Sequence, residues 1–135
     1  MAVRTAVVGV GHLGKHHARL LATVPDSTFV AAVDLIEDRA RAAVSGTPAE
    51  ALTDYRELFG RVDAVVVAVP TRAHLEVARE FISRGVHVLV EKPMAASLAE
   101  ADEMIALAAA RGVVLAVGHT ERFNPAVQAA LPVLT

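Results

Sequence analysis

The stretch that decides the fold is AVVGVGHLGK, residues 6–15, which belongs to a longer segment that ends at Asp34. An apolar run rich in β-branched residues leads into a glycine turn. Apolar residues then recur at helical spacing on one face (Leu13, Leu20, Leu21 and Val24). This pattern predicts a strand, a turn and a helix with an apolar face. The free N–H groups and the dipole at the beginning of such a helix favour an anion, usually a phosphate.

Each glycine of the turn has a separate expected role. Gly9 permits the tight turn, Gly11 lets the backbone approach a pyrophosphate, and Gly14 lets the helix pack closely on the strand. Asp34 ends the next apolar run, twenty positions after Gly14, where a carboxylate can accept the ribose hydroxyls of an adenosine. The segment therefore predicts a dinucleotide site, with a purely structural glycine turn as the alternative. The expected cofactor-binding residues are Gly9, Gly11, His12, Leu13, Gly14 and Asp34.

Composition limits the class of protein. The chain has 135 residues, 54% of them hydrophobic, and we expect a single dinucleotide-binding domain over residues 1–135. No apolar run approaches the about 18 residues that a membrane span needs, and the N-terminus does not read as a secretory signal. The absence of cysteine excludes disulfides and thiolate metal sites, and a net charge of −2 gives no case for nucleic acid or membrane binding. We therefore expect a cytoplasmic location.

Strand and helix patterns alternate along the rest of the chain. Strands are expected at residues 49–52, 62–69, 86–90 and 113–117. Helices are expected at residues 37–44, from a capping box at Asp54 to Gly60, from a cap at Thr71 to Gly85, and from a capping box at Ser97 to Gly112. The alternation predicts an α/β Rossmann fold, a doubly wound parallel sheet of about six strands in three layers.

Ligands of such sheets bind outside the carboxyl ends of the strands, so the loops at those ends are the places to look for chemistry. PTRAH (70–74) follows the fourth strand, EKPM (91–94) the fifth, and GHTERFNP (118–125) the sixth. Lys92 is one of only two lysines. A lysine can lose its proton when desolvated and an arginine cannot, so Lys92 is the candidate for proton transfer. The alternative is a solvated loop pair of Glu91 and Lys92.

The GVGHLG, PTRAH and EKP motifs resemble the glucose–fructose oxidoreductase/myo-inositol dehydrogenase (Gfo/Idh/MocA) family over the whole chain. The resemblance implies that Lys92 is catalytic and lies near the nicotinamide, and that Glu91 and Pro93 shape its turn. It also implies that Pro70, Thr71 and His74 lie along the cofactor. GHTERFNPA is similar to members that oxidise nucleotide-linked sugars, such as UDP-N-acetylglucosamine 3-dehydrogenases. The candidate substrate-side residues are His119, Arg122 and Asn124.

Family members continue into a second domain that binds the substrate and builds a homo-oligomer, and the sequence contains no counterpart of it. We therefore expect the chain to bind NAD and to be nearly inactive alone, and the longer protein to oxidise a hydroxyl of a sugar, nucleotide sugar or cyclitol. NAD is expected over NADP because Leu35, and no arginine, follows Asp34, although Arg39 and Arg41 lie further along.

Other functions fit the sequence less well. A regulatory NAD-sensing module, of the kind attached to potassium channels, shares the length and the glycine turn but has no need of EKP. A methyltransferase lacks the full glycine motif. His12 and His16 are four residues apart, but no carboxylate or thiol lies close in sequence, so no metal site is expected. His87 is expected to be a satisfied core or edge residue of its strand.

Overall fold

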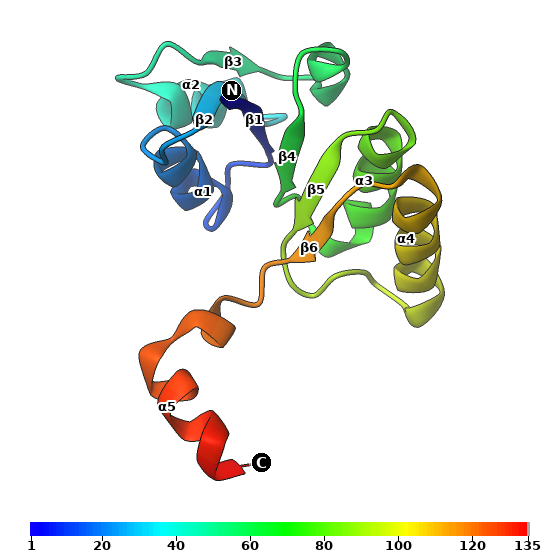
Figure 1. Ribbon diagram of the computed structural model, residues 1–135. Coiled ribbons are helices and arrows are strands. Elements are labelled where there is room, and N and C mark those ends of the chain that lie inside the picture. Colours follow the sequence, from blue (N-terminus) through cyan, green and yellow to red (C-terminus); the bar gives the residue numbers. More distant parts are fainter. Residues whose placement is uncertain (135) are drawn as a thin grey trace.

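The computed structural model describes residues 1–134 and consists of a parallel sheet with helices on both faces (Figure 1). The strand order is β3-β2-β1-β4-β5-β6, so the chain winds outward in both directions from β1. The predicted three-layer Rossmann fold is therefore confirmed. The strands are β1 (Val3–Val8), β2 (Ser27–Val33), β3 (Glu50–Leu52), β4 (Ala64–Val67), β5 (His87–Val90) and β6 (Leu115–Val117).

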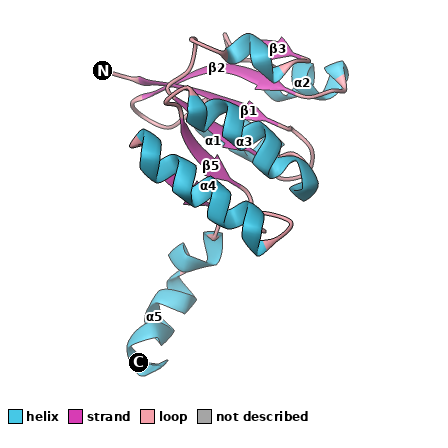
Figure 2. Cartoon of the chain, turned by 90° about the vertical axis from the view of Figure 1, so that its right-hand side faces the viewer, coloured by secondary structure: helices cyan, strands magenta, loops and turns pink. Residues whose placement is uncertain are grey.

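Helices α1 and α2 pack on one face of the sheet, and α3 and α4 pack side by side on the other (Figures 1 and 2). A last helix, α5, extends away from the sheet (Figure 2). The bounds are α1 (Gly14–Leu21), α2 (Glu37–Val44), α3 (His74–Ser83), α4 (Leu98–Arg111) and α5 (Pro125–Leu134), with 3₁₀ turns η1 (Tyr55–Leu58), η2 (Thr71–Ala73) and η3 (Thr120–Phe123).

The two faces of the sheet bury two separate cores because successive strand residues point to opposite sides. In β1, Ala6 and Val8 join the core under α3 and α4, which also contains Phe81 and Met104. Val7 joins the smaller core under α1 and α2. Strands buried on both faces explain the short, almost uninterrupted apolar runs of the sequence.

Only Leu21 of the predicted apolar face of helix α1 packs against the core. Leu13, Leu20 and Val24 are 45%, 48% and 47% exposed, and the helix is buried through Gly14 and Ala18. A Cβ built on Gly14 would lie 1.7 Å from the carbonyl oxygen of Gly9. The helix lies so close to the end of β1 that a side chain does not fit at Gly14, and Leu13 and Leu20 lie outside the contact.

Three of the expected helix beginnings also differ. The expected capping box at Asp54 is instead the cap of the 3₁₀ turn η1, in which the Asp54 carboxylate accepts the N–H of Arg56. Thr71 does not cap a helix: it opens the 3₁₀ turn η2, and α3 begins at His74. Ser97 does cap α4 by accepting the N–H of Glu100, but the Glu100 carboxylate accepts the N–H of Ala96 instead of completing the capping box on Ser97. Gly85 and Gly112 end their helices with positive φ angles, as predicted.

The amino-terminal edge of the sheet carries an ion pair that is remote from the glycine turn. The guanidinium of Arg4 on β1 lies 2.7 Å from the carboxylate of Asp63, just before β4. Hydrogen bonds from the side chain and backbone of Arg4 lower the pKa of Asp63 from 3.8 to about 2.

None of the helices formed by residues 1–134 has both the length and the apolar character needed to span a bilayer.

The contact between Gly14 and Gly9 yields a stability prediction. Gly14→Ala places a methyl group inside the van der Waals radius of a backbone oxygen, so α1 must shift off β1. We expect the free energy of unfolding to fall by roughly 2 kcal/mol or more in urea denaturation. Gly11→Ala is the matched control, because a Cβ there meets no atom within 4 Å, and it should change the value by less than about 1 kcal/mol. Equal losses in the two variants would contradict the proposed packing.

Candidate functional site

The glycine turn lies at the carboxyl end of β1, and its three glycines face different surroundings. Gly9 has φ +89°, and a Cβ on it would lie 2.7 Å from the backbone of Ala68, which follows β4. Gly14 is closed off by Gly9 itself. At Gly11 the space where a Cβ would stand is open. The first and third glycines are therefore required by the protein's own packing, whereas Gly11 leaves room for a molecule outside it.

Helix α1 begins at this turn with an uncapped end. No side chain caps it at Leu13, and its first turn contains no acidic residue. His12 and Leu13 are exposed beside Gly11. The beginning of the helix, which has no side-chain cap, therefore lies beside the open space at Gly11, and helix beginnings of this kind bind phosphate in other proteins.

Asp34 is fixed beside the glycine turn at the end of β2. Its Oδ2 accepts the N–H of Val10 at 3.1 Å, and its Oδ1 accepts the N–H of Ile36 at 2.9 Å. A carboxylate oxygen has more than one acceptor position, so each can still accept a hydroxyl from solvent or a ligand. The side chain is half-buried and oriented by the same turn that would hold a pyrophosphate.

The loop after β5 is built on a buried carboxylate. Glu91 is 6% exposed, with its Oε1 2.6 Å from Nε2 of His17 on α1. Its Oε2 accepts the backbone N–H of Lys92 at 3.1 Å. The Lys92–Pro93 peptide bond is cis, and both residues are exposed. The alternative of a solvated Glu91–Lys92 pair is therefore wrong: Glu91 points inward, and Lys92 makes no ion pair with any residue from 1 to 134.

A second buried polar side chain, His74, joins the loop after β4 to the same turn. It is 1% exposed, with Nε2 2.8 Å from the carbonyl oxygen of Val69 and Nδ1 3.0 Å from that of Pro93. The imidazole therefore supports the two loops from inside. At the surface of the loop after β4, Pro70 is exposed and Thr71 is half-buried.

The loop after β6 contributes one residue to this arrangement and carries the others away from it. Gly118 is buried, and a Cβ on it would lie 2.8–3.0 Å from the carboxylate of Glu91. His119 and Arg122 are exposed, and Asn124 accepts the N–H of Ala126 at the beginning of α5. Within residues 1–134, no hydrogen bond joins these three candidates to the glycine turn or to Lys92.

One residue of the site was not among the predicted ones. His17 follows Gly14 by three residues, which places it one turn into α1, where it meets Glu91. The only signal in the sequence is its distance from the glycine turn, because its partner is 74 residues away. The part of the chain that the structure describes contains no group of three or more side chains that could hold a metal ion.

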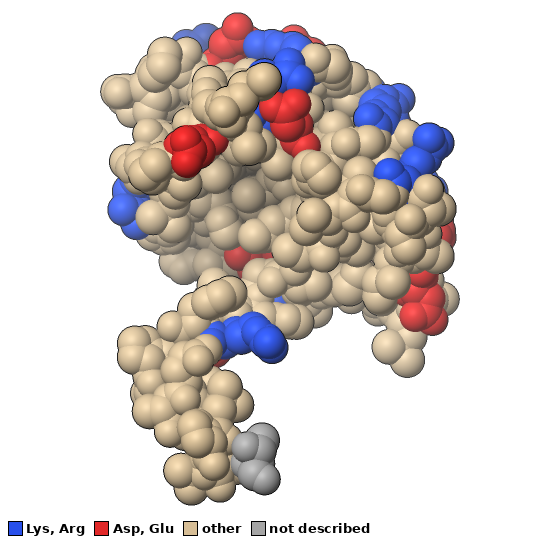
Figure 3. All heavy atoms as spheres, in the orientation of Figure 1, with Lys and Arg blue, Asp and Glu red and all other residues tan. Residues whose placement is uncertain are grey.

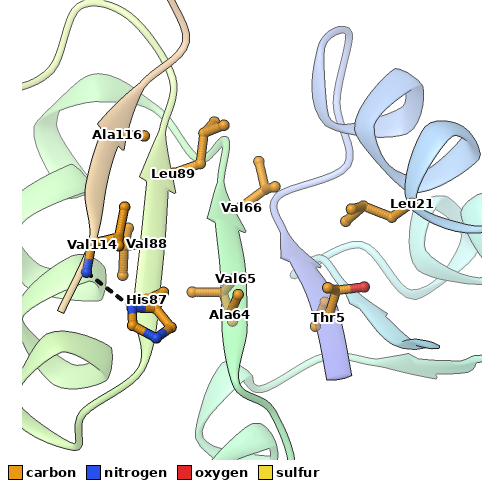
Figure 4. Close-up of a pocket in the computed structure, with 11 residues that line it drawn as sticks. Thr5, Leu21, Ala64, Val65, Val66, His87, Val88, Leu89, Val114 and Ala116 are labelled. Atoms are coloured by element: carbon orange, nitrogen blue, oxygen red, sulfur yellow. Dashed lines mark hydrogen bonds between the residues drawn. The ribbon is translucent and has the colours of Figure 1, made fainter. Parts of the chain in front are cut away.

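A hollow of about 230 Å³ lies elsewhere, on the face of β1, β4, β5 and β6 that α3 and α4 do not cover (Figures 3 and 4). Apolar side chains line it, among them Leu21, Val66 and Leu89. His87, the first residue of β5, lies at one end of the hollow and is exposed. Its Nδ1 accepts the N–H of Val114 at 2.9 Å (Figure 4). His87 is thus a satisfied edge residue, as predicted. Among the residues that line the hollow, only Thr5 and His87 carry polar side chains, and the lining has neither a carboxylate nor a helix beginning to orient a dinucleotide.

The glycine turn, the uncapped helix and Asp34 on a doubly wound parallel sheet define a Rossmann-type dinucleotide-binding domain. Residues 3–119 match the family described as "Oxidoreductase family, NAD-binding Rossmann fold" (GFO_IDH_MocA), and the chain belongs to this family. The residues present fit its cofactor, since the space at Gly11 and the uncapped helix can take a pyrophosphate and Asp34 a ribose. The match favours an oxidoreductase over a regulatory module or a methyltransferase.

Three relatives illustrate the likeness. UDP-N-acetylglucosamine 3-dehydrogenase of Acidithiobacillus ferrooxidans is 39% identical over 93% of this chain and 40% of its own length. Its solved structure gives a TM-score of 0.91 over 98% of this chain and 44% of that one, at 37% identity. The scyllo-inositol 2-dehydrogenase (NAD⁺) of Bacillus subtilis is 34% identical over 92% of this chain and 37% of its own length.

The third relative is the solved structure of GenD2 from gentamicin A biosynthesis in complex with NAD. It gives a TM-score of 0.82 at 36% identity and covers 87% of this chain and 34% of that one. The chain thus spans about 40% of the length of the curated relatives that it matches.

The open space at Gly11 yields a binding prediction. Gly11→Val should leave the fold intact, since its Cβ meets nothing within 4 Å, but should obstruct a pyrophosphate. A ligand at about 100 times its dissociation constant stabilises a protein by roughly 2.7 kcal/mol, so NAD should raise the melting temperature of the parent and not of Gly11→Val. Ala22→Val, an exposed change at the other end of α1, is the control that keeps the shift. An unchanged shift in Gly11→Val would place the cofactor elsewhere.

Proposed function

We propose that this chain is the cofactor-binding part of an oxidoreductase that transfers hydride between NAD and a secondary hydroxyl of a sugar, nucleotide sugar or cyclitol. The observation that supports it most is the position of Lys92. The buried carboxylate of Glu91 contacts His17 on α1, the helix that begins at the glycine turn. The same carboxylate accepts the backbone N–H of Lys92, whose side chain is exposed to solvent. The substrate class is supported by the names of the two dehydrogenases to which the chain is similar.

The residues divide the proposed cofactor site into two halves. Asp34 would bind the ribose of the adenosine, and the glycine turn would bind the pyrophosphate. The nicotinamide would then lie at the loops after β4 and β5, on the same carboxyl edge of the sheet. When bound, the nicotinamide supplies the hydride acceptor. Pro70 and Thr71 would border the cofactor, and Pro93 would shape the edge beside it.

Lys92 is proposed as the group that handles the proton of the substrate hydroxyl. The neutral amine of a lysine at this edge can accept the proton of the substrate hydroxyl, and the ammonium so formed can donate a hydrogen bond to the oxygen while the hydride leaves the carbon that bears it. Lysine suits this role because desolvation can release its proton, which arginine retains. His119, Arg122 and Asn124 stay candidates for the substrate side, on the loop after β6.

The surroundings of Asp34 yield a prediction about cofactor choice. A 2′-phosphate would lie against a fixed carboxylate, and the nearby Arg41 is already paired with Glu37 at 2.5 Å. NAD⁺ should therefore bind more tightly than NADP⁺ in calorimetry. Asp34→Asn, which keeps the size of the side chain and removes its charge, should narrow the difference. Tighter binding of NADP⁺ by the parent would contradict the proposal. It would indicate that Arg39 binds the 2′-phosphate and outweighs the repulsion by Asp34.

The proposed role of Lys92 yields the test of the enzymatic function. In an active polypeptide that carries this domain, Lys92→Ala should lower turnover by roughly 10²-fold or more, the usual scale for a proton-transfer group. NAD affinity, measured by calorimetry on the same variant, should stay within a few-fold, because the pyrophosphate is held at Gly11. Near-normal turnover would rule out the role, and a large loss of NAD affinity would show that the lysine serves the cofactor instead.

A further inference from the structure

The carboxylate of Glu91 is the point where three segments that are distant in sequence meet. His17 approaches it from α1 at 2.6 Å, and the N–H of Lys92 approaches at 3.1 Å from its own turn. The backbone of Gly118, after β6, packs so closely against it that a Cβ would lie 2.8 Å from Oε2. Each carboxylate oxygen therefore has a separate hydrogen-bond partner, and the backbone of Gly118 covers one side of the carboxylate.

Burial makes the partner of this carboxylate important. Glu91 is 6% exposed, and burying a carboxylate costs free energy of desolvation unless charged or polar groups form hydrogen bonds with it. Removing one partner removes a hydrogen bond and leaves the desolvation cost unchanged. An ionised carboxylate only accepts hydrogen bonds, and with Glu91 in that form Nε2 of His17 is the donor. Among residues 1–134, His17 supplies the only side-chain donor to Glu91.

The geometry relates this pair to the backbone of Lys92. While His17 holds Oε1, Oε2 remains directed at the N–H of Lys92, the residue at which the chain leaves the sheet. Without the histidine, Oε1 of the buried carboxylate has no side-chain donor, and we expect the carboxylate to turn toward water. The N–H of Lys92 would then lose its acceptor.

We propose that His17 is a positioning residue for Lys92, acting through Glu91. The pair holds the Lys92 turn against α1, so the helix that begins at the glycine turn and the loop that presents the lysine keep one relative position. The catalytic meaning of this link rests on the proposed function, whereas the link itself concerns only residues of this chain.

The chain offers a direct measurement, because its two lysines give only two signals when lysine alone is labelled with ¹⁵N. The amide of Lys92 donates to Glu91, and that of Lys15 donates to Gly11 and serves as the internal reference. In His17→Leu, hydrogen exchange of the Lys92 amide should accelerate by at least about tenfold, the equivalent of one hydrogen bond to a charged acceptor. The Lys15 amide should change by less than about twofold.

Three further variants separate positioning from general destabilisation. His17→Gln places an amide donor near the position of Nε2 and should restore slow exchange of the Lys92 amide. His17→Asn is polar and tolerated at a partly exposed position but too short to reach Glu91, so it should exchange as fast as His17→Leu. It also provides the measurement if the leucine variant does not fold. His16→Leu, at the exposed neighbouring position, is the matched control and should leave Lys92 unchanged.

The proposal is overturned if His17→Asn leaves the exchange of the Lys92 amide within about twofold of the parent, or if His17→Gln fails to slow it. Adding NAD to the parent sample tests the proposed function separately. An absence of binding would contradict the cofactor site and leave the exchange result valid. Binding together with unchanged exchange in the His17 variants would support the cofactor site and refute the positioning role.

Discussion

The backbone contact between Gly14 and Gly9 is the constraint on which the rest of the site depends. Because no Cβ separates them, α1 begins against the end of β1, and its first N–H groups are held at the carboxyl edge of the sheet. The same contact leaves Gly11 facing open space. It also sets the depth at which His17, one turn later, meets Glu91. The glycine motif therefore shapes both the pyrophosphate end and the support of the Lys92 turn.

Two buried polar side chains join the loops at this edge. Glu91 connects α1, the Lys92 turn and Gly118, and His74 connects the loop after β4 to the carbonyl of Pro93. Buried polar groups are stable only when their partners are in place, so each connection requires the correct arrangement of the other loops. Lys92 is exposed, but the backbone that carries it is fixed from inside. This arrangement suits a group that must meet a cofactor and a substrate in one geometry.

The sequence predicts the fold because the signals for it are local. The glycine motif, the alternating patterns and the capping at Ser97 each concern residues a few positions apart, and the doubly wound parallel sheet is predicted from them. The exposed leucines of α1 could not be predicted by periodicity, because periodicity locates an apolar face but does not measure how close the helix approaches the sheet. Gly14 carries that information, and its contact overrides the pattern of Leu13 and Leu20.

The sequence offers candidate site residues where they follow a strand, as Asp34 and Lys92 do, and gives no signal where two distant segments meet. The inward direction of Glu91 and the role of His17 depend on a contact across 74 residues, and no local pattern contains it. The sequence reads the same whether the glutamate at position 91 is buried or exposed, so only the packed structure distinguishes the two cases.

The most direct test of the account is a map of the NAD site on the protein itself, by amide chemical-shift changes in the ¹⁵N-labelled chain during an NAD titration. The account predicts that the largest changes lie at Gly9 to Gly14, around Asp34 and at Lys92, all on the carboxyl edge of the sheet. Changes centred on Val66, Leu89 and His87, which line the apolar hollow on the sheet face, would contradict it, as would an absence of saturable changes.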